Sequence, residues 1–171
     1  MRKIIYFILP FIILILLNNC SGYKPIFAAG NIEFNINKHT IKDNKILGNK
    51  FYSKLYNLSK SNKNKKNSKS LNILISAKKE KSTTSKNSAG KTLEYRIVLT
   101  VKTIITDAKN DEKIMDEIFT SSINYNVQDQ YSDTLKLENK STDELLDATY
   151  RKFLIKFSEK IISRWLKKVM R

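Results

Sequence analysis

The sequence contains one cysteine, one histidine and four glycines among 171 residues, and each shortage excludes a class of chemistry. Because Cys20 has no second cysteine to pair with, the chain cannot form an internal disulfide. His39 likewise has no partner for metal binding or nucleophilic catalysis. So few glycines leave no Gly-rich loop of the kind that cradles phosphates. Asp107 and Asp111 resemble paired carboxylates, but their sequence context is typical of a turn. We therefore expect no enzymatic activity, no metal site and no cofactor.

The first 22 residues have the organisation of an export signal. Two basic residues precede an apolar run that ends at Leu17. This run of about 14 residues is shorter than the roughly 20 residues that a transmembrane helix needs, and it suits a secretory signal. Cys20 follows where signal cleavage would leave it at the new N-terminus. Leu17-Asn18-Asn19-Cys20 resembles a bacterial lipobox, with asparagines where small residues are usual.

These features predict a lipoprotein signal peptide at 1–19, lipidation of Cys20 by acyl chains such as palmitate, and a lipidated tether at 20–30. Ser21 stands where an aspartate would be the usual signal for retention in the inner membrane. We therefore expect the protein at the outer membrane, facing the periplasm. The alternative is an uncleaved membrane anchor, or an ordinary signal peptide in which the cysteine has no role.

The charge is strongly basic, with a formal net charge of +16. Such a surface suits an anionic partner, which could be nucleic acid, acidic lipid headgroups or a phosphorylated glycolipid. Export argues against nucleic acid, because little of it reaches a tethered periplasmic protein. Part of the excess charge has a simpler explanation, since the chain is crowded with lysine, asparagine and isoleucine, as an AT-rich genome would encode.

Hydrophobic periodicity predicts the elements of one domain at 31–171. Alternation predicts a strand over 32–36, and apolar residues at steps of three and four predict a helix over 47–58. A solvated, disordered basic loop is predicted at 59–70, where no residue is apolar. Three further strands are predicted over 71–77, 93–101 and 119–125, with a polar stretch at 81–90 and a hairpin turn at 107–111.

The C-terminal segment is predicted to be a long amphipathic helix. Ser141-Thr142-Asp143-Glu144 fits the capping-box pattern, which places the helix start at Ser141. The element order is then β-α-β-β-β-α. An apolar sheet face needs cover, and two amphipathic helices can supply it on one side. We expect an α+β fold, a two-layer sandwich in which a sheet of about four strands is covered by two helices.

The basic residues of the central hairpin are the candidate binding groups. Lys91, Arg96 and Lys102 are the candidates for contacts to a phosphorylated glycolipid, and the last two should project from the same sheet face. Guanidinium and ammonium groups can together engage phosphates. The alternative is that each of these side chains only solvates the polar side of a strand.

Several short motifs resemble one family. Gly22-Tyr23-Lys24-Pro25-Ile26-Phe27 resembles the segment that follows the lipidated cysteine in alphaproteobacterial lipopolysaccharide-assembly lipoproteins, the LptE family. Tyr95-Arg96-Ile97-Val98-Leu99-Thr100-Val101, followed by Thr106-Asp107, is similar to the central strand and turn of that family. Tyr125-Asn126 and Tyr131 before a long C-terminal helix also fit.

This resemblance implies a lipid-anchored subunit that lies in the lumen of an outer-membrane β-barrel of the LptD type and helps to assemble it. The pair would carry lipopolysaccharide to the outer leaflet, and the lipoprotein could contact the glycolipid itself. Two other functions remain open. One is a generic periplasm-facing lipoprotein that binds another anionic envelope component or assembly machine. The other is an envelope hydrolase, which should carry a nucleophile or paired acids that the sequence lacks.

Overall fold

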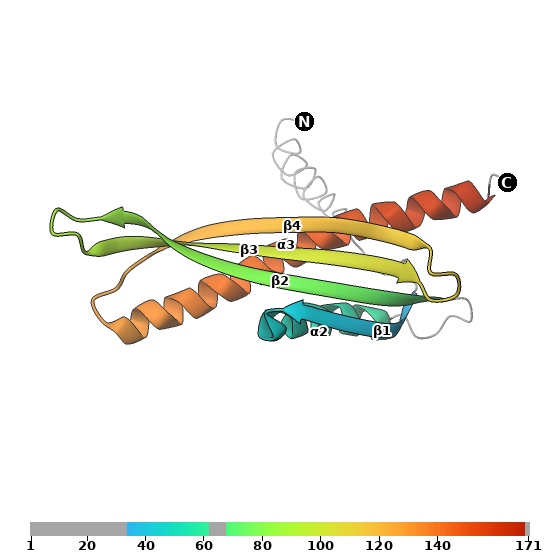
Figure 1. Cartoon of the computed structure of the whole chain (residues 1–171), viewed down its shortest axis with the longest axis horizontal. Coiled ribbons are helices and arrows are strands. Elements are labelled where there is room, and N and C mark those ends of the chain that lie inside the picture. The colour runs from blue at the N-terminus through green and yellow to red at the C-terminus, as the bar shows by residue number, and fades with distance from the viewer. Residues whose placement is uncertain (1–33, 62–67, 170–171) are drawn as a thin grey trace, which may run out of the picture.

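The computed structural model describes residues 34–61 and 68–169 (Figure 1). Its elements are β1 (Phe34–Asp43), α2 (Lys45–Ser61), β2 (Lys69–Lys86), β3 (Thr92–Asp107), β4 (Lys113–Asn126) and α3 (Tyr131–Val169). The predicted order β-α-β-β-β-α is confirmed, and the fold is α+β. The predicted signal peptide, Cys20 and the tether lie outside the described residues.

The four strands form one sheet in the order β1-β2-β3-β4. β1 is parallel to β2, and α2 makes the connection that a parallel pair requires. The other two pairs are antiparallel, which confirms the predicted hairpin between β3 and β4. Its turn is closed by Asp107, whose carboxylate Oδ1 accepts a hydrogen bond from the Lys109 N–H at 2.9 Å, and by Asp111 at a positive φ of 53°.

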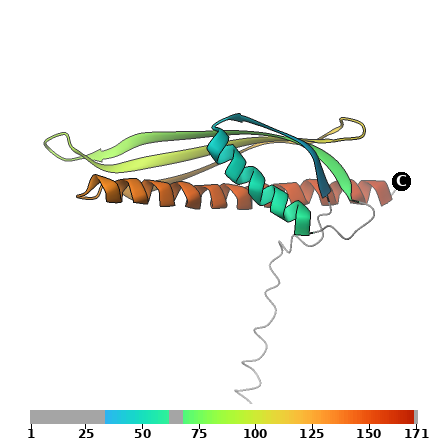
Figure 2. The same cartoon turned by 90° about the horizontal axis from the view of Figure 1, so that it is seen from below.

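Both helices lie on the same side of the sheet, with α3 running along its length and α2 crossing beside it (Figure 2). This arrangement follows from the alternation within each strand. In β3, Ile97, Leu99 and Val101 are fully buried, whereas their even-numbered neighbours lie on a face that no described helix covers. We call this second side of the sheet the open face.

The core between the layers is rich in aromatic rings. Phe51 of α2 meets Phe153 of α3 edge-on, with ring centroids 5.4 Å apart. Phe153 also stacks on Phe157 at 5.3 Å, and Phe157 meets Phe34 of β1 edge-on at the same distance. All four rings are buried, so one cluster joins β1 to both helices.

α2 begins and packs by simple local devices. The Asn44 side chain is the N-cap, because its Oδ1 accepts a hydrogen bond from the Leu47 N–H at 3.1 Å. Gly48 then lets the helix approach β1, since a Cβ at this position would overlap the Ile41 side chain. Without this close approach, α2 could not lie flat against the sheet.

The predicted start of the C-terminal helix at Ser141 is wrong. α3 begins at Tyr131 and has 39 residues, so the capping-box motif lies inside it. Ser141 and Thr142 are buried, and the Thr142 hydroxyl donates to the Glu138 carbonyl one turn earlier at 2.8 Å. The N–H of Thr134 donates to the Gln130 carbonyl at 3.2 Å, which marks the true first turn.

Two polar segments also differ from their predictions. β2 continues through the polar stretch to Lys86, because these residues pair with the start of β3. The predicted loop at 59–70 is too wide: Ser59–Ser61 belong to α2 and Lys69–Ser70 belong to β2, while 62–67 lie outside the described residues. Ser59 continues the helix because its hydroxyl is buried and donates to the Tyr56 carbonyl at 2.8 Å.

Candidate functional site

At one end of the sheet, the β2–β3 hairpin lies near the start of α3 (Figure 1). A cavity of about 250 Å³ is lined by residues of these segments. We call it the end cavity. Its lining combines cations, aromatic rings and a few acidic side chains. The lining residues are Lys81, Lys91, Tyr95, Val127, Gln128, Asp129, Tyr131, Thr134, Leu135 and Glu138.

Strand alternation carries two lysines of β2 to the helix-facing side of the sheet. Lys79 and Lys81 continue the odd-numbered series whose earlier members are buried in the core. Both meet Glu138 of α3, with Lys79 Nζ 2.9 Å from Oε1 and Lys81 Nζ 2.6 Å from Oε2. Only 14% of the Glu138 side chain is exposed, so this pairing takes place partly shielded from water.

Two tyrosines complete this cluster. Tyr125 of β4 donates its hydroxyl to Glu138 Oε2 at 3.0 Å. The Lys81 ammonium lies 4.1 Å from the ring centroid of Tyr95, which is a cation–π distance. Lys81 therefore has its charge fixed by a carboxylate on one side and by an aromatic face on the other.

The pKa values of the cluster follow from these contacts. Burial raises the pKa of Glu138, but the hydrogen bonds from Lys81, Lys79 and Tyr125 outweigh burial and lower this pKa to about 2. Burial similarly lowers the pKa of Lys81, whereas its contacts to Glu138 and Tyr125 raise it further and prevail. Lys81 and Glu138 are therefore both charged at neutral pH.

A replacement of Glu138 by glutamine should lower stability in a pH-dependent way. Because the pKa of Glu138 falls from 4.5 to about 2 in the folded protein, its stabilising effect is complete above pH 4.5. It is lost as the pH falls towards 2. We expect Glu138→Gln to lower the free energy of unfolding by about 2 kcal/mol at neutral pH, and by almost nothing near pH 2.

Urea denaturation of the full chain at several pH values measures this difference. Glu144→Gln is the matched control, because Glu144 lies on the same helix and makes only an exposed pair with Lys140 at 3.9 Å. Its cost should stay below about 0.5 kcal/mol. A Glu138→Gln deficit that stays constant down to pH 2 would contradict the assignment.

The end cavity suits a ligand with both anionic and apolar parts. Lys91 at the hairpin turn has an exposed side chain and adds a third cation beside Lys81. Nearby apolar side chains are also exposed, with 44% of Leu135 and 45% of Leu93 accessible to solvent. Cations beside exposed apolar groups can bind the phosphate and the hydrocarbon of one amphiphile.

The structure divides the three candidate residues of the hairpin between two faces. Lys91 lines the end cavity. Arg96 and Lys102 lie on the open face, where Arg96 Nε donates to Asn124 Oδ1 at 3.0 Å and Lys102 Nζ is 3.7 Å from Asp116 Oδ1. The lipidation residue Cys20 is outside the described residues.

The sequence analysis did not identify Glu138, Lys79 or Lys81 as site residues. A signal for the lysines was present, because odd-numbered residues of β2 alternate inwards from Leu71 and this register continues to both of them. A lysine whose side chain points towards a packed helix is stabilised by an acidic side chain on that helix. Glu138 precedes the predicted helix start at Ser141, so the sequence pattern does not place it on the helix that faces these lysines.

Within 34–61 and 68–169, neither helix has an apolar stretch long enough to cross a bilayer. The same residues contain no group of three histidine, cysteine or acidic side chains that could hold a metal ion.

Neither the protein-family models nor the curated proteins include a match to this sequence. Solved structures do resemble it. A candidate lipoprotein from Caulobacter crescentus has a TM-score of 0.54 at 10% identity, over 75% of this chain and 91% of the other. Rare lipoprotein B from Shewanella oneidensis has a TM-score of 0.49 at 13% identity, over 77% and 98%. Lipoprotein B from Nitrosomonas europaea has a TM-score of 0.47 at 20% identity, over 71% and 82%. The Caulobacter likeness shows a shared fold.

Proposed function

We propose that this chain is an outer-membrane lipoprotein that assembles with a β-barrel of the LptD type, lies in its lumen and assists lipopolysaccharide transport to the outer leaflet. It acts by binding and catalyses no reaction. The lipobox at Cys20 and the family motifs behind it support the anchor and the partner. The fold shared with a candidate lipoprotein is consistent with an anchored envelope protein.

The end cavity is the observation that carries the cargo assignment. Lipid A of lipopolysaccharide bears phosphates next to acyl chains, and the cavity sets Lys81 and Lys91 beside exposed apolar side chains. The lysines alone could bind a soluble anion, and the exposed apolar side chains would then have no role in binding. The exposed Leu135 and Tyr131 of its lining are explained when the ligand also has hydrocarbon to bury.

The end cavity lies away from the point where the described part of the chain begins. Phe34, the first described residue, pairs with Lys69 at the start of β2, whereas the end cavity is lined by Lys81 in the second half of that strand and by Lys91 after it. Arg96 and Lys102 on the open face would be secondary contacts for the same glycolipid or for the barrel wall.

Co-purification tests the assignment to a translocon. The full chain, tagged at its C-terminus, is purified from detergent-solubilised outer membranes, and an unrelated tagged outer-membrane lipoprotein serves as the control. We expect a large barrel protein in a fixed ratio with this chain and none with the control. Absence of any barrel, with a different anionic envelope component retained, would favour the generic lipoprotein instead.

A further inference from the structure

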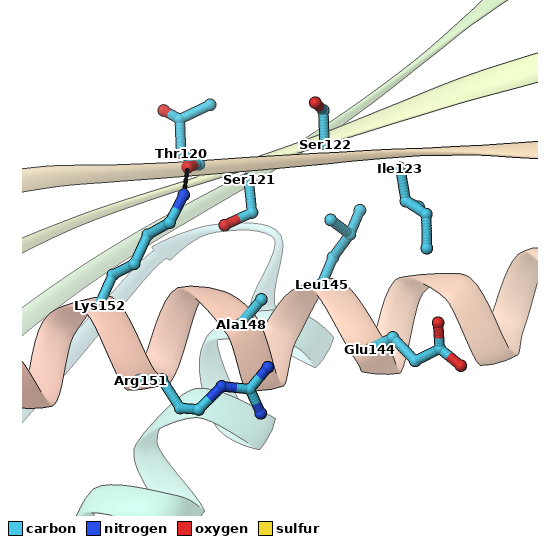
Figure 3. Close-up of a pocket in the computed structure, with 9 residues that line it drawn as sticks. All are labelled: Thr120, Ser121, Ser122, Ile123, Glu144, Leu145, Ala148, Arg151 and Lys152. Atoms are coloured by element: carbon cyan, nitrogen blue, oxygen red, sulfur yellow. Dashed lines mark hydrogen bonds between the residues drawn. The ribbon is translucent and has the colours of Figure 1, made fainter. Parts of the chain in front are cut away.

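One edge of the sheet offers unpaired backbone groups. β4 is an edge strand, and the hydrogen bond from the Val127 N–H to the Leu93 carbonyl at 2.8 Å shows that its odd-numbered residues pair with β3. Antiparallel pairing alternates, so the N–H and C=O of Thr120, Ser122 and Asn124 point away from the sheet. Lys152 Nζ of α3 donates a hydrogen bond to the Thr120 carbonyl at 2.6 Å, which shows that this carbonyl points away from β3 (Figure 3).

This edge has little protection against pairing with another chain. Ile118–Ile123 contains no charged residue and no proline, which are the usual protection of an exposed edge. β1, the other edge strand, carries Lys38, Lys42 and Asp43. Among the described residues, the side chain of Lys152 covers this stretch of β4. This side chain is long, flexible and exposed, so it can be displaced.

A groove runs between this edge and α3. Its volume is about 530 Å³, and Ala148 on the helix leaves room beneath the strand. Figure 3 shows Ser121 pointing from β4 into this space, towards the helix. Ser121 is only 8% exposed, and within the described residues its hydroxyl has no hydrogen-bond partner. An unpaired buried hydroxyl is costly, and a side chain placed in the groove would satisfy it.

The charged side chains beside the groove determine which kind of segment it favours. Arg151 and Lys152 lie on the helix side of it, and Glu144 lies nearer its other end. A strand that pairs with β4 takes the Thr120 carbonyl from Lys152. The released ammonium and Arg151, both exposed, then form a positive pair beside the groove, which favours an acidic side chain on the incoming strand.

We propose that the β4–α3 groove binds an extended segment of a partner protein by strand addition, with one acidic side chain of that segment meeting Arg151 and Lys152. Backbone hydrogen bonds to Thr120, Ser122 and Asn124 hold the segment, and its alternate side chains enter the groove. This inference stands apart from the proposed function, since it depends on neither the lipid anchor nor the glycolipid.

A synthetic peptide tests the inference on the full chain in detergent. The probe has about eight residues, alternating threonine and valine with one central glutamate, which is long enough for one strand. Its fluorescence anisotropy reports binding. We expect the peptide to bind, and its counterpart with a central lysine to bind about tenfold more weakly. Arg151→Glu leaves Lys152 as the one cation of this pair and should remove the preference for glutamate.

Ser122→Pro separates strand addition from other modes of binding. Proline removes the outward N–H of Ser122 but leaves the ladder between β3 and β4 intact, because odd-numbered residues form that ladder. We expect Ser122→Pro to abolish peptide binding and Ser122→Ala to preserve it, with equal thermal unfolding for both. Hydrogen exchange at the amides of Ser122 and Asn124 should slow when the peptide binds.

Three results would overturn the inference. The first is that neither peptide binds to the wild-type chain. The second is equal binding by Ser122→Pro. The third is a wild-type dimer that Ser122→Pro converts to a monomer in analytical ultracentrifugation, because the edge would then pair with a second copy of this chain.

Discussion

Replacing Cys20 with serine is expected to abolish acylation of the chain completely. Serine has no thiol on which a thioether-linked lipid can form, and the sequence has no second cysteine to take its place. Cells that produce the variant in the presence of radiolabelled palmitate should show no label on this protein. The chain should also disappear from the outer-membrane fraction, because one missing group removes the whole anchor.

Ser21→Ala is the matched control for the Cys20 variant. It changes a neighbouring residue of similar size, keeps the thiol and should be labelled as the wild type is. The ordinary signal-peptide alternative makes a different prediction, since the wild-type chain itself would then carry no palmitate. Label on the Cys20→Ser chain would contradict lipidation at this residue.

Phe153→Ala is expected to have the largest effect on folding. The Phe153 ring is fully buried and contacts four other rings, those of Phe51, Phe119, Tyr150 and Phe157, at centroid distances of 5.3 to 6.0 Å. Its removal leaves a cavity where α2, α3 and β4 meet. We expect a loss of about 3–5 kcal/mol in the free energy of unfolding, a large part of the total for a domain of this size.

Urea denaturation followed by far-ultraviolet circular dichroism measures this loss. Ile155→Ala on the same helix is the control, because its side chain is 37% exposed and its truncation should cost about 1 kcal/mol or less. Equal losses for the two variants would show that the aromatic cluster is not the centre of the core.

The strands could be predicted from the sequence because one face of the sheet is buried. Leu71, Ile73 and Ile75 occupy alternate, buried positions of β2, and this period of two favours a strand over a helix. Pairing between strands is less visible in a sequence. Residues 82–86 are exposed on both faces, so the backbone ladder to the start of β3 holds them in place and periodicity gives no signal.

The start of α3 could not be located from local motifs. The hydroxyls of Ser141 and Thr142 can form hydrogen bonds either as helix caps or within a helix. Only the packing of the preceding turns decides whether the helix starts here or earlier. Those turns depend on Glu138, which is fixed by lysines of a strand far away in sequence. The helix start and the end cavity were therefore missed for the same reason, a long-range charge cluster.

Binding of purified lipopolysaccharide to the full chain is the measurement that tests the central claim most directly. Lys91→Glu reverses a charge in the end cavity, and Lys109→Glu does the same at an exposed turn at the opposite end of the sheet. We predict that the chain binds intact lipopolysaccharide, that Lys91→Glu weakens binding about tenfold or more, and that Lys109→Glu does not. Equal binding by both variants, or equal binding of dephosphorylated lipopolysaccharide by the wild type, would contradict the account.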